Sequence, residues 1–243
     1  MNAASLQLLP PHATLHWLAG EARLGVYAAG ETLQREGDQA LYVMNIRAGS
    51  VKVYKQLSDG RQAVVGFLFS GDFVGLAALE VYTSSVQALE PVEAWRFPRE
   101  AFRQLVADRP RLEAALLGRV TRDLEAAQVQ MLLLSRKTAI ERLTSFLLQL
   151  AGREPGDATG QIQVPLHMTR SDMADHLGLT TETVSRCFTR LRKAGLIRLY
   201  EAGEVTLVDI PRLEAVAAGR GPTWCGTGAS SRRAGVRRRS SSS

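Results

Sequence analysis

Residues 170–195 read RSDMADHLGLTTETVSRCFTRLRKAG, and their pattern predicts two short helices that cross at a tight turn. Ala174 stands where a bulky side chain would collide with the second helix, and Gly178 stands where the turn needs a positive φ. The inward positions of both helices are apolar: Met173, Leu177, Leu179, Val184 and Cys187. Together these features predict a helix-turn-helix.

Both predicted helices are flanked by residues that commonly cap or end helices. Thr169 is placed to cap the first helix, and Asp172, three residues later, makes an approximate capping box with it. Thr180 is placed to cap the second helix, and Gly195 to end it in a left-handed conformation. The following stretch, LIRLYEAGEVTLV, predicts two short strands around Ala202 and Gly203, which form a wing.

Three polar side chains share the outward face of the second helix, at spacing i, i+3 and i+4. In a major groove Arg186 can donate two hydrogen bonds to guanine, Glu182 can accept one from cytosine, and Ser185 can reach a base edge or the backbone. An acidic residue weakens nonspecific attraction to a polyanion, so Glu182 favours base reading of double-stranded DNA. The alternative is that this face is an ordinary solvated helix surface.

Basic residues gather around this segment. The net charge of the chain is +6, but residues 220–243 hold six arginines and no acidic residue, and without them the remaining basic residues only balance the 24 acidic ones. Residues 170–198, in contrast, carry six basic and three acidic side chains within this neutral body. We expect contacts to DNA phosphates from Thr169, Arg170, Thr180, Thr181, Arg190 and Lys193.

Between about residues 24 and 97 the chain shows short apolar runs separated by turn signals. Ser58-Asp59-Gly60 lies between two β-rich runs and predicts a hairpin turn. Glycines at positions 30, 37, 49, 60, 66, 71 and 75 are expected to separate the predicted short strands. This pattern predicts a small antiparallel β-roll over residues 23–108.

After Pro98 the apolar period becomes helical. Apolar residues recur at alternating steps of three and four, a pattern typical of a coiled-coil seam, at Leu117, Val120, Leu124, Ala127, Met131 and Leu134. One alternative is that this stripe packs on the β domain of its own chain. The next stretch, SRKTAIERLTSFLLQLAG, has its own amphipathic stripe for such cover, so we favour a dimerisation helix over residues 109–136 and a homodimer.

The predicted fold is therefore α+β, with an N-terminal antiparallel β-roll, a long dimerisation helix and a C-terminal winged helix-turn-helix. The expected divisions are a leader (1–22), the β-roll (23–108), the dimerisation helix (109–136), the winged domain (137–217) and a disordered Arg/Ser-rich tail (218–243). No secretory signal is apparent, and no apolar run approaches the roughly 20 residues of a membrane span. We expect a cytoplasmic protein with no membrane partner.

The order of these parts resembles the CRP/FNR family of bacterial transcription regulators over roughly residues 20–215. The resemblance rests on the GDFVG turn, the long helix, LLLSRKTAIERLTSFLLQL and MTRSDMADHLGLTTETVSR, and the ETVSR stretch resembles the FNR branch. It implies a cyclic-nucleotide-binding-like β-roll and a homodimeric activator that reads TTGAT-N4-ATCAA with Glu182, Ser185 and Arg186. It also implies contact with RNA polymerase through loops such as 56–62, and target genes of low-oxygen or nitrogen-oxide metabolism.

The chain departs from the family pattern at two cofactor sites. The only cysteines are Cys187 and Cys225, which excludes the family's N-terminal iron–sulfur cluster and leaves no metal-ligand spacing. Between Gln62 and Trp95 there is no Lys or Arg, so a cyclic phosphate would be left unpaired and control by cyclic AMP is not expected. We expect no cofactor.

Several alternatives stay open. A regulator gated by an effector in the β-roll, such as haem answering nitric oxide or another small ligand, is the main one; His12, His16, His167 and Met44 are the available haem ligands, each with an ordinary structural role as the simpler explanation. Cys187 is expected to be a small buried side chain, and the alternative is a redox brake in which oxidation displaces Arg186. No nucleophile paired with a base, no paired carboxylates and no phosphate-binding loop emerge, so an enzyme is not expected.

Overall fold

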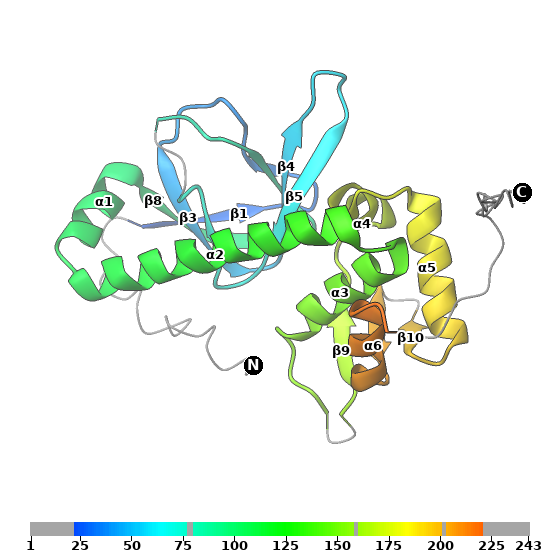
Figure 1. The fold of residues 1–243 in the computed structure, drawn as a ribbon. Coiled ribbons are helices and arrows are strands. Elements are labelled where there is room, and N and C mark those ends of the chain that lie inside the picture. The colour runs from blue at the N-terminus through cyan, green and yellow to red at the C-terminus, as the bar shows by residue number, and fades with distance from the viewer. Residues whose placement is uncertain (1–21, 77–79, 158–159, 201–202, 221–243) are drawn as a thin grey trace, which may run out of the picture.

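The computed structural model describes residues 22–76, 80–157, 160–200 and 203–220. An N-terminal β domain, a long helix and a C-terminal domain of helices with a small sheet follow one another (Figure 1), which confirms the predicted α+β class. Residues 1–21 of the predicted leader and most of the predicted Arg/Ser-rich tail lie outside the described residues, as do His12, His16 and Cys225.

The β domain contains two antiparallel four-stranded sheets. One sheet has the order β1 (Arg23–Tyr27), β8 (Val92–Pro98), β3 (Tyr42–Ala48) and β6 (Phe73–Val74). The other has the order β2 (Thr32–Gln34), β7 (Ser85–Ala88), β4 (Val51–Gln56) and β5 (Gln62–Leu68). Alternate residues of both sheets turn inward and form one buried core, which includes Met44, Ile46, Val51, Val86 and Ala94.

The glycines of the β domain serve two purposes. The predicted hairpin turn joins β4 to β5, and Gly60 in it has a φ of +85°. Positive φ angles also occur at Gly30, Gly37, Gly49, Gly71 and Gly75, as expected for turns. The interpretation of Gly66 as a strand break was wrong, because Gly66 pairs with Val53 inside β5, beside a register shift; a glycine within a strand commonly marks such a bulge.

Two helices follow the β domain, α1 (Arg99–Ala107) and α2 (Pro110–Arg136). With 27 residues, α2 is about 40 Å long, and it runs along the β domain from α1 to the C-terminal domain (Figure 1). Among the described residues, no helix combines the length and apolarity that crossing a bilayer requires.

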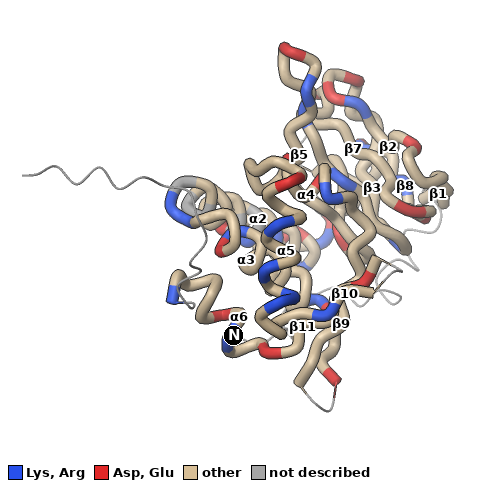
Figure 2. Tube along the Cα trace, turned by 90° about the vertical axis from the view of Figure 1, so that its right-hand side faces the viewer, with Lys and Arg blue, Asp and Glu red and all other residues tan. Residues whose placement is uncertain are grey.

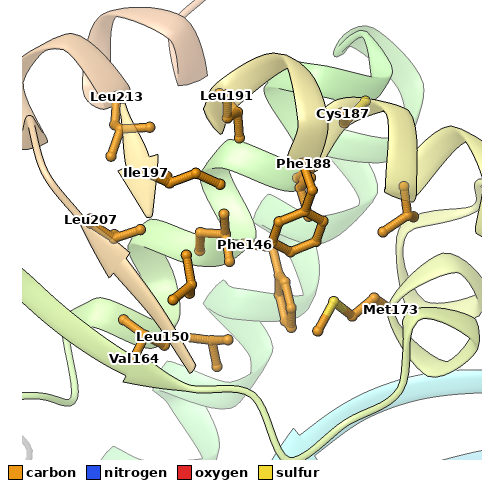
Figure 3. Packing of buried hydrophobic residues seen from close by; sticks show 14 of the residues in the cluster. Phe146, Leu150, Val164, Met173, Cys187, Phe188, Leu191, Ile197, Leu207 and Leu213 are labelled. Atoms are coloured by element: carbon orange, nitrogen blue, oxygen red, sulfur yellow. The ribbon is translucent and has the colours of Figure 1, made fainter. Parts of the chain in front are cut away.

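The C-terminal domain is built on α3 (Ala139–Ala151), α4 (Arg170–Leu177), α5 (Thr181–Lys193) and α6 (Ile210–Ala217). A small sheet has the order β10 (Ile197–Tyr200), β11 (Glu204–Leu207) and β9 (Ile162–Pro165), and β10 with β11 forms the predicted wing. Figure 3 shows the core that these elements share, in which Phe146, Leu150, Met173, Phe188, Leu191, Ile197 and Leu207 are buried or nearly so.

Candidate nucleic-acid interface

Helix α4 begins with the capping box that the sequence predicts. The side chain of Thr169 accepts a hydrogen bond from the main-chain N–H of Asp172 at 3.1 Å. In return, Oδ2 of Asp172 accepts from the main-chain N–H of Thr169 at 3.0 Å and from its hydroxyl at 2.6 Å. These bonds satisfy donors that the first turn of a helix leaves open, and they fix where α4 starts.

The turn and the second helix follow the expected geometry. Gly178 is left-handed with a φ of +61°, and the hydroxyl of Thr180 accepts from the main-chain N–H of Thr183 at 3.2 Å. Helix α5 ends before Gly195, which has a φ of +70°. The two helices are therefore held at a fixed crossing by caps and glycines that local sequence specifies.

Helix α5 has one buried and one exposed face. Val184, Cys187 and Leu191 lie in the core of the C-terminal domain. The side chains of Glu182 and Arg186 are 73% and 74% exposed, and Ser185 between them is exposed too. We call Glu182, Ser185 and Arg186 the reading face, because all three point away from the protein in the first half of α5.

The reading face is internally connected. Nη2 of Arg186 donates to Oε1 of Glu182 at 2.6 Å, across one turn of the helix. The hydroxyl of Ser185 donates to the main-chain oxygen of Thr181 at 2.9 Å. An exposed i, i+4 pair is worth only about 0.3–0.5 kcal/mol, so it orients the guanidinium without preventing its release to a base.

The residues predicted to contact phosphates lie on and beside α5. Thr169, Thr180, Thr181, Arg190 and Lys193 are exposed, and in Figure 2, which looks onto α5, basic positions follow the helix towards β10. Arg170 differs, because its guanidinium lies over the ring of Phe188, with Cζ 3.2 Å from the ring centroid. Burial lowers the pKa of Arg170 to about 10, so the group stays charged at neutral pH while packing on α5.

The apolar stripe of α2 is uncovered in the single chain. Leu117 is 67% exposed and Met131 is 64% exposed, and Val120, Leu124, Ala127 and Leu134 are exposed too. The alternative in which this stripe packs on the β domain of its own chain is therefore wrong. An exposed apolar stripe of this length on a helix is typical of a protein interface.

The remaining candidate residues have ordinary surroundings. Cys187 is buried, and burial raises the pKa of its thiol although Arg190 acts in the opposite direction. Met44 lies in the β core and its sulfur accepts from the hydroxyl of Tyr27 at 3.7 Å, while Nδ1 of His167 lies 3.2 Å from a carboxylate oxygen of Glu90. Among the described residues, no group of three or more His, Cys, Asp or Glu side chains is arranged to hold a metal ion.

One structural position that the sequence did not reveal is Arg142 on α3, which helps to place the helix-turn-helix. Its guanidinium donates to the main-chain oxygens of Leu134 at 2.7 Å, Lys137 at 3.0 Å and Leu177 at 3.0 Å. It thus joins the C-terminal end of α2 to the C-terminal end of α4, where carbonyl groups have no partner within their helices and a positive charge is favourable. Its partners are main-chain atoms, so no pairing of residue types could have indicated this role.

Comparison with known proteins agrees with this geometry. Residues 24–109 match the cyclic nucleotide-binding domain family, and residues 141–216 match the Crp-like helix-turn-helix domain family. The chain is 37% identical to the nitrogen fixation regulation protein FixK of Bradyrhizobium diazoefficiens, over 79% of this chain and 81% of that one. It is also 37% identical to the transcriptional activator Anr of Pseudomonas aeruginosa, over 79% of each chain.

A solved structure shows the same arrangement of parts. FixK2 from Bradyrhizobium japonicum superposes with a TM-score of 0.73 at 32% identity, covering 79% of this chain and 96% of that one. The relatives are named as transcription regulators, which agrees with the expectation that this chain is not an enzyme. The chain belongs to the CRP/FNR family, and it is a transcription activator of the FNR and FixK type with a DNA-binding helix-turn-helix.

Proposed function

We propose that the protein acts as a homodimer that reads an inverted repeat of the TTGAT-N4-ATCAA type with Glu182, Ser185 and Arg186. The observation that carries the proposal is the exposure of these three side chains together on α5, backed by a buried face that fixes their direction. In the FNR branch, which the ETVSR stretch resembles, the same residue types read the TTGAT half-site. Arg186 supplies the bidentate contact to guanine, and Glu182 accepts from cytosine.

The exposed stripe of α2 supplies the dimer. Two α2 helices that bury their seams on one another place two helix-turn-helix units about a two-fold axis, and a palindrome then presents one half-site to each α5. The two recognition helices must lie about 34 Å apart to enter successive major grooves on one side of the duplex. Phosphate contacts come from the exposed residues Thr169, Thr180, Thr181, Arg190 and Lys193, which flank the reading face, whereas the guanidinium of Arg170 packs on Phe188.

Target genes of low-oxygen or nitrogen-oxide metabolism are part of the proposal, and the names of two relatives support a link to nitrogen metabolism. One is named for nitrogen fixation, and another, 33% identical, is the fumarate and nitrate reduction regulatory protein of Salmonella typhi. Activation would involve RNA polymerase at exposed loops of the β domain, such as 56–62, where Leu57 and Asp59 are exposed.

A second function is favoured by the match of residues 24–109 to a ligand-binding domain family. In that alternative a small effector such as haem binds the β domain and controls DNA binding. The sequence from Gln62 to Trp95 has no Lys or Arg to pair with a cyclic phosphate, so an anionic nucleotide is the effector least suited to this domain.

A binding titration separates the two functions. Purified apoprotein is titrated on TTGAT-N4-ATCAA and on a scrambled duplex, with and without reducing agent, and its mass is measured by sedimentation. Specific binding by a ligand-free dimer supports the first function. An absorption band of haem, or binding that needs an added ligand, supports the second. A single chain that ignores the palindrome contradicts the homodimer proposal.

A further inference from the structure

Helix α4 contacts strand β5 of the β domain as well as α5. Asp172 and His176 lie one helical turn apart, and both reach strands of the second β sheet. Nζ of Lys52 on β4 lies 2.7 Å from Oδ1 of Asp172, and the two side chains are only 13% and 9% exposed. A largely buried ion pair therefore joins the β domain to the first helix of the helix-turn-helix.

The carboxylate of Asp172 serves two structures at once. Oδ2 closes the capping box with Thr169, and Oδ1 accepts from Lys52. Burial acts to raise the pKa of Asp172, but the hydrogen bonds from Lys52 and Thr169 outweigh it and hold this pKa below its usual value. The start of α4, and hence the orientation of the whole helix-turn-helix, is thus coupled to the position of β4.

An aromatic contact lies one turn further along α4. Nδ1 of His176 donates to the main-chain oxygen of Val64 on β5 at 3.3 Å. Its ring lies 5.3 Å from the ring of Phe67 on β5 and 5.4 Å from that of Phe146 on α3, centroid to centroid. This packing restricts sliding of α4 on the sheet, because the rings fix how closely the helix approaches the strands and the hydrogen bond fixes its position along β5.

A second anchor lies at the turn between β5 and β6. Asp72, whose side chain is 3% exposed, accepts from Arg119 of α2 at 2.9 Å and pairs with Arg153, just after α3, at 3.2 Å. One buried carboxylate thus connects the β domain, the dimerisation helix and the C-terminal domain. The helix-turn-helix is therefore held at a defined place relative to α2.

We propose that Lys52 is a positioning residue for DNA binding, which holds the helix-turn-helix so that the two reading faces of a dimer match one spacing between half-sites. The inference rests on the proposed function, since it needs a dimer and an inverted repeat. Removal of Lys52 leaves Asp172 buried without its cation, which is unfavourable and loosens the hold of β4 on the start of α4, while the His176 and Asp72 contacts remain. The dimer then presents its second reading face at a range of distances, and its effective concentration at the correct spacing falls.

The test uses the full-length protein and a series of inverted repeats with spacers of two to six base pairs. Lys52→Met is compared with wild type and with Lys55→Met, a matched control on the same strand, whose lysine is half exposed and pairs with Glu36 at 3.1 Å. Wild type and Lys55→Met should prefer one spacer. In Lys52→Met the ratio of affinities for the preferred spacer and for the other spacers should fall by about tenfold, while the affinity for a single half-site stays unchanged. Lys52→Arg, which keeps the charge, should restore the preference.

The outcomes are distinguishable. If wild type binds no inverted repeat, the proposed function fails. The positioning role is overturned if wild type shows a spacer preference and Lys52→Met keeps it. It is also overturned if Lys52→Met loses as much affinity for a single half-site as it does for the full inverted repeat. Lys52→Gln is measured in parallel, and if neither substitution gives a protein with wild-type helicity by circular dichroism, Lys52 is a residue of general stability and the proposal fails as well.

Discussion

Arg186 and Glu182 form an ion pair of 2.6 Å on the exposed face of α5. The pair orients the guanidinium along the helix, and the negative charge of Glu182 makes this face less attractive to phosphates in general. A half-site that offers an acceptor pair to Arg186 and a donor to Glu182 satisfies both groups, whereas another sequence leaves one of them without a partner.

Arg186→Ala should therefore cost about 1–3 kcal/mol per half-site and relax the preference at the guanine. Lys193→Ala is the control, because it lies at the end of α5 and should weaken all duplexes alike while lowering the salt slope by about 1. Fluorescence anisotropy on the palindrome and on guanine-substituted duplexes, at several salt concentrations, measures both. If Arg186→Ala weakens every duplex equally, Arg186 is a phosphate contact and not a reader.

Leu124→Glu should convert the protein to a monomer. Leu124 is 59% exposed in the single chain, and each protomer would forfeit roughly 1.5–3 kcal/mol of leucine burial in the seam. Val129→Glu is the matched control, since Val129 is 54% exposed on the same helix but lies on the side away from the seam. Sedimentation equilibrium should show a monomer for the first variant and a dimer for the second. Equal masses for both variants would refute the seam.

Acidification should destabilise the protein through His176. Burial lowers the pKa of His176 in the folded state, so the unfolded chain binds a proton at this position more readily than the folded protein. Stability is therefore highest above the unfolded pKa of about 6.5 and is lost as pH falls towards the lower folded pKa. His176→Phe should flatten the change of the urea midpoint between pH 7.5 and 5.5. His167→Gln, at the Glu90 contact, is the control and should keep the wild-type change of the urea midpoint with pH. If His176→Phe also keeps that change, His176 is not the cause of the acid sensitivity.

The helix-turn-helix could be predicted from sequence because its signals are local. Thr169 and Asp172 are three residues apart, and Gly178 alone fits a left-handed turn, so short-range pattern fixes both. The ion pair of Lys52 and Asp172 joins residues 120 positions apart, and the capping box already accounts for Asp172. Gly66 was misread for a related reason, because a strand glycine beside a bulge and a turn glycine look alike until the register of β4 and β5 is known.

Peroxide should affect the native protein and Cys187→Ala alike. The thiolate is the form that reacts with peroxide, and burial raises the pKa of Cys187, so the thiol stays protonated and shielded in the core of the C-terminal domain. Operator binding is measured after a brief treatment, with Cys225→Ala as the control for the second cysteine. If native protein loses binding while Cys187→Ala retains it, α5 opens often enough to expose the thiol, and the redox brake replaces the structural role.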